Sequence, residues 1–131
     1  MVMTDKRAQR RYSLVFPVRV GITVDGCDAL IETECVELSA SGLTLSCDEA
    51  LIGALLAQAR FPRTCALAFA PPESSLHFAI DCHVVRHRRL SRQHFHLVAL
   101  FRHFREGSTE LLTDYLASSA GKTTVWPRAA R

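Results

Sequence analysis

The amino-acid sequence predicts a mainly β fold: a small barrel of about six antiparallel strands, with a C-terminal helix and one short helix between strands. Two patterns indicate this fold. Apolar and polar residues alternate over several short stretches, which is the period of a half-buried strand. Turn-forming residues, such as those at 25–26 and 71–72, separate these stretches. A two-sheet sandwich is the alternative, and the barrel is the architecture that we expect.

The first strand shows the alternation most clearly. Val18, Val20 and Ile22 alternate with polar or small residues, and Pro17 suits the start of a strand. The pair Asp25–Gly26 then favours a tight hairpin turn, because both turn positions favour a positive φ. The expected strands cover residues 18–24, 28–38, 43–47, 65–69, 76–87 and 95–101.

Two segments are predicted to be helical. Asp48 can cap the N-terminus of a short helix that is rich in alanine and leucine and ends at about Gln58. Residues 108–110 can open a second, amphipathic helix near the end of the chain. Its apolar residues recur at helical spacing and are Leu111, Leu112, Tyr115 and Leu116.

The chain of 131 residues is long enough for one domain with its own core. We divide it into a mobile basic arm (1–12), a barrel domain with its terminal helix (13–117) and a flexible basic tail (118–131). The N-terminus has no apolar signal region, and no apolar run approaches the roughly 20 residues of a membrane helix. We therefore expect a cytoplasmic protein without membrane insertion, for which an oligomer is possible.

Catalytic and metal chemistry find little support in the sequence. The five cysteines form no Cys-x-x-Cys pair, and most lie inside apolar stretches, where we expect a structural role as small buried apolar residues. The six histidines lie between positions 77 and 103, where nearby arginines would repel a metal cation. Ser39 lies in no Gly-x-Ser-x-Gly motif, and no glycine-rich phosphate loop opens a helix. We expect no enzyme activity, no metal and no cofactor.

Charge is unevenly distributed along the chain, although the net charge is only +3. Residues 25–49 include seven acidic side chains and no lysine or arginine, whereas residues 60–105 include eight arginines and two acids. These charges either interleave in the fold or mark a face for an anionic partner. The basic segment 86–92 is expected to be a solvated hairpin tip, and it could also add positive charge near a ligand or dock an acidic partner.

Two polar stretches stand out from this background. Residues 6–11 form a basic segment that contains Arg7, Arg10 and Arg11. Residues 36–45 are predicted to be a strand end, a tight polar turn and the start of the next strand. In this turn Glu37, Ser39 and Gly42 place a carboxylate, a hydroxyl and a bare backbone at spacings of two and three residues. We expect the two stretches to form one site.

These two stretches resemble the motifs of a known family. Arg7 and Arg11 fit the RxxxR pattern of PilZ domains, and Ser39 with Gly42 fits the second pattern of that family, (D/N)xSxxG. The stretches 84–86 and 97–101 and the terminal helix are also similar, so that the resemblance covers roughly residues 7–117. It implies a six-stranded antiparallel PilZ-type barrel that binds the bacterial second messenger cyclic di-GMP.

The resemblance also implies a role for the arginines. Cyclic di-GMP carries two phosphates and two guanines, and the planar fork of arginine matches both a phosphate and the O6/N7 edge of guanine. Arg7 and Arg11 would therefore close over the ligand from the mobile arm. Arg10 would assist by stacking on a base or by adding positive charge.

In the turn, the resemblance assigns one contact to each motif position. Glu37 would accept hydrogen bonds from guanine, and Ser39 would offer its hydroxyl to a base or a phosphate. Gly42 would permit a positive φ and a close approach of the backbone. The family has Asp or Asn where this chain has Glu37, and the extra methylene predicts weakened binding, by about 1–3 kcal/mol for a misplaced buried contact.

The function implied is that of a non-enzymatic receptor. Binding of cyclic di-GMP would change the conformation of the arm and the affinity for a downstream protein, in motility, pili, exopolysaccharide or virulence. The alternative is a degenerate PilZ domain that does not bind nucleotide and acts as a protein-interaction adaptor. A third hypothesis is a barrel that binds nucleic acid. Few exposed aromatic residues suit base stacking, so we expect no DNA or RNA partner.

Overall fold

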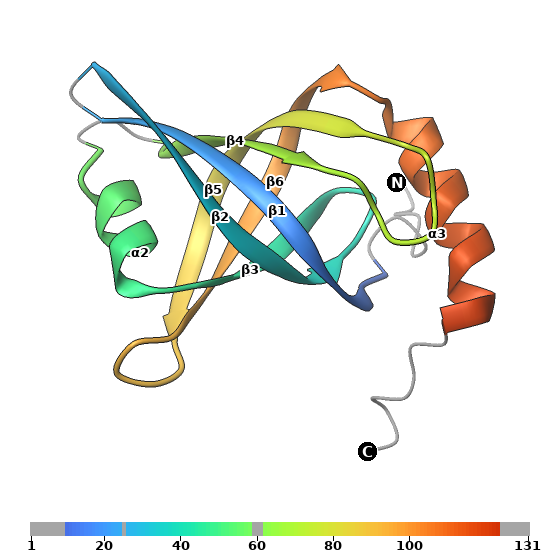
Figure 1. The fold of residues 1–131 in the computed structure, drawn as a ribbon, viewed down its shortest axis with the longest axis horizontal. Helices are drawn as coiled ribbons and strands as arrows, with labels where there is room; N and C mark the ends of the chain where they lie inside the picture. Colours follow the sequence, from blue (N-terminus) through green and yellow to red (C-terminus); the bar gives the residue numbers. More distant parts are fainter. Residues whose placement is uncertain (1–9, 25, 59–61, 124–131) are drawn as a thin grey trace, which may run out of the picture.

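The computed structural model describes residues 10–24, 26–58 and 62–123. Within this part of the chain six antiparallel strands close into a barrel in the order β1-β2-β3-β6-β5-β4 (Figure 1). The strands are β1 (Tyr12–Val24), β2 (Cys27–Leu38), β3 (Gly42–Cys47), β4 (Thr64–Phe69), β5 (Phe78–Arg89) and β6 (Phe95–Glu106). The prediction of a mainly β, six-stranded antiparallel barrel is therefore confirmed.

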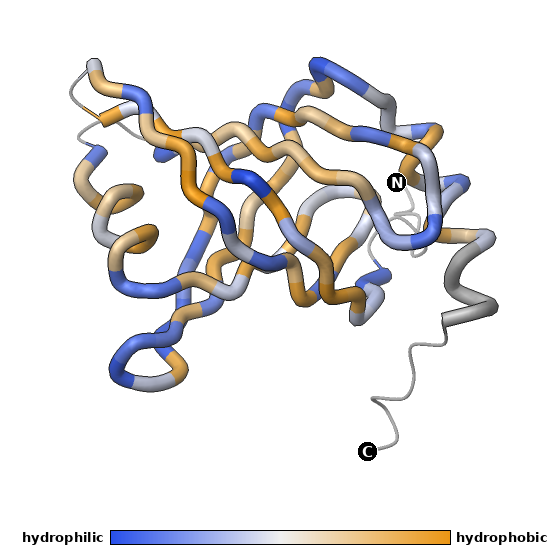
Figure 2. The backbone as a smooth tube through the Cα atoms, viewed as in Figure 1, coloured by the Kyte–Doolittle hydropathy of each residue, from blue (hydrophilic) through white to orange (hydrophobic). Residues whose placement is uncertain are grey.

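The core fills the inside of this barrel. Along β1 every second side chain from Leu14 to Ile22 is buried, as the alternation in the sequence predicts. Figure 2 shows the same alternation as hydrophobic and hydrophilic segments that follow one another along the strands. Four of the cysteines, Cys35, Cys47, Cys65 and Cys82, are buried and free. Burial raises the pKa of the Cys47 thiol to about 12, so this residue acts as an inert part of the core.

The first strand begins earlier than predicted. It starts at Tyr12, passes a bulge between Ser13 and Phe16, and places Pro17 opposite Glu34 of β2. A proline is tolerated inside this strand because β4 pairs with β1 only from Arg19 to Gly21. Pro17 therefore has no partner on β4 to which an N–H would have to donate. The residues assigned to the arm lie mostly at positions 1–9, outside the described residues.

Two helices pack at opposite ends of the barrel (Figure 1). Helix α2 (Glu49–Leu56) has the predicted cap, since the Asp48 carboxylate accepts a hydrogen bond from the Leu51 amide at 3.0 Å. Helix α2 buries Leu51, Ile52 and Leu55. No helix in the described ranges is long and apolar enough to cross a bilayer.

Helix α3 (Thr109–Thr123) buries Leu112, Tyr115 and Leu116, and the Tyr115 hydroxyl donates to the Pro72 carbonyl at 3.0 Å. The helix extends past the boundary predicted at 117, so the first part of the segment assigned to a flexible tail is helical. No proline interrupts it there, and the small residues from Ala117 onward tolerate a helical backbone.

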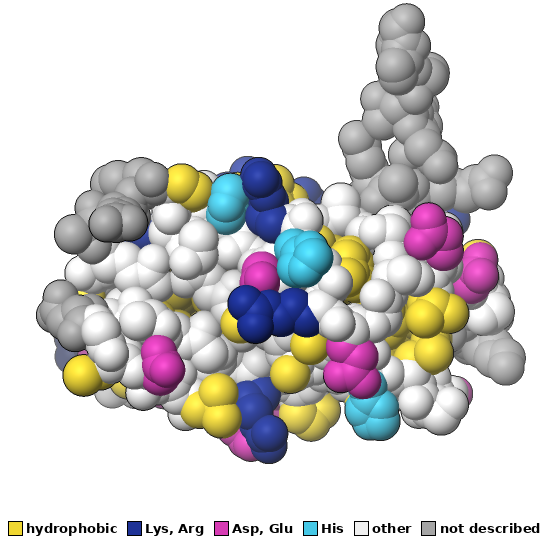
Figure 3. All heavy atoms as spheres, turned by 90° about the horizontal axis from the view of Figure 1, so that it is seen from above, with side chains coloured by type: hydrophobic (Ala, Val, Ile, Leu, Met, Phe, Trp, Pro, Cys, Tyr) yellow, Lys and Arg dark blue, Asp and Glu magenta, His cyan; other side chains and the backbone are white. Residues whose placement is uncertain are grey.

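Two ion pairs connect neighbouring strands of the barrel. Arg19 of β1 contacts the Glu32 carboxylate of β2 at 3.3 Å, and Arg105 of β6 contacts Asp81 of β5 at 2.9 Å. On the face shown in Figure 3, basic, acidic and histidine side chains lie beside one another. Neither pair joins the acidic segment 25–49 to the basic segment 60–105, because Arg19 lies outside the basic segment and Asp81 lies within it, so both interpretations of the charge distribution stay predictions.

Strand β5 contains a bulge. Val84 lies opposite Ala99 and Arg86 lies opposite Val98, so Val85 is an extra residue without a partner on β6. A bulge of this kind shifts the alternation of a strand by one position. The side chains that follow Val85 therefore face the opposite side from the one that an uninterrupted strand would give them.

Candidate ligand-binding site

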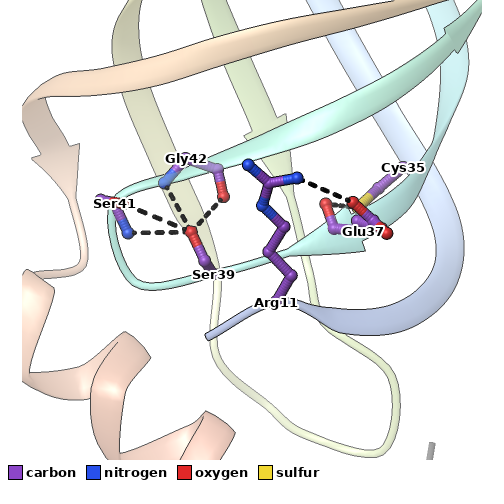
Figure 4. A network of polar contacts seen from close by, with 6 residues as sticks. All are labelled: Arg11, Cys35, Glu37, Ser39, Ser41 and Gly42. Atoms are coloured by element: carbon purple, nitrogen blue, oxygen red, sulfur yellow. Dashed lines mark hydrogen bonds and ion pairs between the residues drawn. The ribbon is translucent and has the colours of Figure 1, made fainter. Parts of the chain in front are cut away.

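The site is built where β1 begins beside the end of β2 (Figure 4). Ser13 lies opposite Glu37 in the β1–β2 register, which places Arg11 next to Glu37. The Arg11 Nη1 atom lies 3.8 Å from the Glu37 Oε1 atom, and the two side chains are 57% and 39% exposed. An ion pair this long and this exposed contributes less than about 1 kcal/mol, so both groups remain available to a ligand.

The turn between β2 and β3 is held together by Ser39. The Ser39 hydroxyl accepts hydrogen bonds from the amides of Ser41 and Gly42, both at 3.2 Å, and donates to the Gly42 carbonyl at 3.1 Å. The Ser39 amide also donates to the Gly42 carbonyl, at 2.9 Å. Because Ser39 is buried and these bonds occupy its hydroxyl, its observed role is to fix the shape of the turn. Ser39 also lines a hollow beside this turn, and the expected contact of its hydroxyl with a ligand stays a prediction.

Gly42 is required for a reason that differs from the predicted one. Among the described glycines a positive φ occurs only at Gly26 (79°) and Gly107 (85°), so the positive φ expected at Gly42 is wrong. A Cβ atom at position 42 would instead lie 2.4 Å from the carbonyl oxygen of Ala99 on β6. Gly42 therefore does permit a close approach of backbone, as predicted, and the backbone that approaches it belongs to strand β6.

A hollow of about 240 Å³ opens over these groups. Its floor and rim include Arg11, Glu37, Ser41 and Gly42, and its far wall is formed by Val98 and Leu100 of β6. The hollow thus combines a cation, a carboxylate, backbone groups and an apolar wall. A planar base with polar edges fits this combination, because its faces are apolar and its edges donate and accept hydrogen bonds.

The apolar wall was missed by the sequence reasoning. Val98 and Leu100 occupy the outward positions of β6, between the inward residues Leu97, Ala99 and Phe101. An apolar residue at a position predicted to face solvent was the available signal, and Leu100 is indeed 42% exposed.

The other predicted residues are placed as follows. Arg10 lies over the ring of Tyr12, with its guanidinium carbon 5.8 Å from the ring centroid, and so does not point at Glu37 in this structure. Arg7 lies outside the described residues. Below the site, the Cys35 thiol donates to the Glu37 carbonyl at 3.2 Å, and burial raises the pKa of that thiol well above its ordinary value. The described residues contain no group of three or more His, Cys, Asp or Glu side chains that could hold a metal ion.

The fold and this site define a class of protein, since a closed six-stranded barrel carries an arginine before β1 and a Ser-x-x-Gly turn between β2 and β3. The family model of the PilZ domain matches residues 5–118, and the chain belongs to the PilZ domain family. No curated protein matches the sequence.

A solved structure with the same fold is that of the PlzA protein of Borreliella burgdorferi, determined in complex with c-di-GMP. The similarity has a TM-score of 0.56 at 12% sequence identity, and it covers 89% of this chain. The chain spans about half of PlzA, since the alignment covers 54% of that protein. At this identity the similarity concerns the fold.

Removal of the Ser39 hydroxyl tests its role in the turn. In Ser39→Ala the amides of Ser41 and Gly42 lose their acceptor, and Gly42 is buried, so we expect the free energy of unfolding to fall by about 1–3 kcal/mol. Urea unfolding measures this change. Ser41→Ala is the matched control. The Ser41 hydroxyl makes a single long contact among the described residues, 3.4 Å from the Ser39 hydroxyl, so its removal should cost little stability. Equal destabilisation by both substitutions would contradict the assignment.

Proposed function

We propose that this protein is a cyclic di-GMP receptor whose ligand binds in the hollow beside the β2–β3 turn. One observation carries the proposal: Arg11 and Glu37 face each other at 3.8 Å on the rim of this hollow, next to a turn that Ser39 and Gly42 hold rigid. Membership of the PilZ family and a fold shared with a c-di-GMP complex support the choice of ligand.

The chemistry of the two charged groups suits this ligand. Guanine presents an N1–H and an exocyclic amine on one edge. Both donate hydrogen bonds, which a carboxylate such as that of Glu37 can accept. It presents O6 and N7 on another edge, which the fork of Arg11 can match, as it can match a phosphate. The weak ion pair between Arg11 and Glu37 is exchanged for contacts with the ligand. Breaking this ion pair costs little free energy, because both side chains are largely exposed.

The arm completes the site in this proposal. Arg7 binds the ligand together with Arg11, and Arg10 leaves Tyr12 to stack on a base or to add charge. Residues 1–12 then take a new conformation over the ligand, with the ordering cost offset by charge-assisted hydrogen bonds. The altered surface changes the affinity for a downstream protein, which is how ligand binding becomes a signal.

Calorimetric titration with cyclic di-GMP, with GMP as the control ligand, tests the proposal. We expect micromolar or tighter binding of cyclic di-GMP and much weaker binding of GMP, which carries a single phosphate and a single base. No heat of binding together with no thermal shift at high ligand concentration would reject the receptor function.

Shortening the acidic side chain tests its part in the site. Glu37→Asp restores the family residue and removes one rotatable bond, so we expect cyclic di-GMP to bind up to about tenfold more tightly. Isothermal titration of the variant measures the change. Glu32→Asp, on an exposed position of the same strand, is the control and is expected to have no effect. Weaker binding by Glu37→Asp would refute the argument from the extra methylene.

A nucleotide-independent adaptor is the second candidate function. The observation that favours it is that Glu37 stands where the family has Asp or Asn, and that its carboxylate pairs with Arg11 at 3.8 Å. A protein with this function would give no heat with cyclic di-GMP and would bind its protein partner equally well with and without the nucleotide.

A further inference from the structure

Two arginines of β5 have no role in the site described so far. Arg86 and Arg88 are exposed, and their side chains make no hydrogen bond or ion pair with any described residue. The neighbouring Arg89 differs, because it donates to the carbonyls of Ser91 and Arg92 and lies over the ring of Phe95. Two uncompensated cations close together on one strand are the kind of group that binds an anion.

The bulge at Val85 determines which way these arginines face. Before the bulge, the buried residues of β5 occupy every second position from Phe78 to Cys82, and Val84 continues this inward set. If β5 continued as a regular strand without the bulge, the same alternation would carry Arg86 and Arg88 to the inner side. The bulge instead pairs them with Val98 and His96, which lie between the buried residues of β6.

The register places Arg86 in the same row as the candidate site. Glu37 of β2 lies opposite Thr44 of β3, Thr44 lies opposite Val98 of β6, and Val98 lies opposite Arg86. These are three strand-to-strand steps, or about 14 Å along the sheet at the usual strand spacing. The long side chains of Glu37 and Arg86 extend over this distance from its two ends.

A second hollow, of about 680 Å³, lies along this row. Its lining includes Arg11 and Glu37 at one end, Thr44 and Val98 in the middle, and Arg86 and Arg88 at the other end. The first four of these residues also line the hollow beside the turn, so the two hollows adjoin each other. Three guanidinium groups and one carboxylate border the larger one, which makes it a site for a ligand with more than one negative charge.

We propose that Arg86 and Arg88 form a second anion-binding subsite, which holds a phosphate of the same ligand that Arg11 and Glu37 bind. This inference rests on the proposed function and adds that the ligand extends from the β2–β3 turn across β3 and β6 to β5. The two arginines are two residues apart on one strand, or about 7 Å, so their forks can approach one phosphate from both sides.

Titration of cyclic di-GMP into charge-removal variants tests the subsite. Arg86→Ala and Arg88→Ala are each expected to weaken binding by about tenfold, the effect of losing one charge-assisted hydrogen bond, with the number of bound ligands unchanged. Arg92→Ala is the matched control. It removes the same charge from the same hairpin, but Arg92 does not line the hollow, so binding should change by less than about twofold in physiological salt.

The other outcomes count against the subsite. Equal effects of all three substitutions would show that the arginines act only through net charge. A fall from two bound ligands to one, with the first binding event unchanged, would show that the subsite holds a separate molecule. Thermal unfolding of each variant checks that the fold is retained, as expected for exposed residues.

A second measurement keeps the subsite testable if cyclic di-GMP does not bind at all, a result that would reject the proposed function itself. Inorganic pyrophosphate is then titrated while the Nε–H resonances of the arginine side chains are followed by NMR. Shifts at Arg86 and Arg88 but not at Arg92 would support the subsite. Shifts of the same size at all three, or at none, would overturn it.

Discussion

Gly42→Ala is expected to lower the free energy of unfolding by about 2–3 kcal/mol, near the upper end of the usual cost of overpacking. The new Cβ atom would lie 2.4 Å from the carbonyl oxygen of Ala99, and also 3.2 Å from the Cα atom of Leu100. Both neighbours are backbone atoms of β6, so no side chain can rotate away to relieve the contact. Strands β3 and β6 must separate locally, which distorts the hollow as well, and cyclic di-GMP binding should weaken together with stability.

Gly53→Ala is the control for this substitution. Gly53 lies in α2, and a Cβ atom built there meets nothing within 4 Å. Alanine is the better helix former, so this variant should be more stable than the natural sequence by about 0.5–1 kcal/mol. Urea unfolding of both proteins gives the comparison. If Gly42→Ala were as stable as the natural sequence, the contact with Ala99 would not be what requires glycine.

Arg11→Ala is expected to weaken binding of cyclic di-GMP by about 10- to 100-fold, because one bidentate charge-assisted contact is lost. We expect a loss of the same order for Arg7→Ala under the proposed function. Stability should hardly change in Arg11→Ala, since the side chain is 57% exposed and its ion-pair partner among the described residues, Glu37, is 3.8 Å away. Calorimetry and thermal unfolding on the same samples separate the two effects.

Arg19→Ala provides the matched control for charge. Arg19 is 56% exposed, pairs with Glu32 on the β1–β2 ribbon and lies away from both hollows that contain Arg11. Its removal changes the net charge by the same amount and should leave the affinity nearly unaltered. An equal loss of affinity in Arg19→Ala and Arg11→Ala would mean that Arg11 contributes only to the general electrostatic field.

Local patterns in the sequence were sufficient to predict most of the fold. The alternation along β1 reports directly which side chains face the core, and the cap at Asp48 is a contact within one turn of helix. Both features depend on neighbours in sequence, which is why they could be predicted. The helix end was placed too early because small residues after 117 give no clear stop signal.

The features that could not be predicted depend on contacts between distant strands. Glycine is required at position 42 because a carbonyl group of β6 lies where a Cβ atom would be. The face of the sheet on which Arg86 lies is set by the register of β5 against β6. The hydrogen bonds by which Ser39 fixes its own turn follow from the packing of that turn, and its motif position alone could not predict them. The binding roles expected of the site residues stay predictions, to be tested by titration with cyclic di-GMP: Arg7, Arg10, Arg11, Glu37, Ser39 and Gly42.

The pairing of β3 with β6 has a consequence for how the protein acquires its function during folding. Almost half of the chain lies between Gly42 and Leu100, which are partners in this pairing. Contacts between residues so far apart form slowly, because a long loop must close before they are made. A nascent chain that has emerged only as far as β3 contains every motif residue from Arg7 to Gly42, yet it lacks the wall of Val98 and Leu100. Under the proposed function, unfinished chains therefore do not sequester the messenger, and competence to bind appears when the barrel closes.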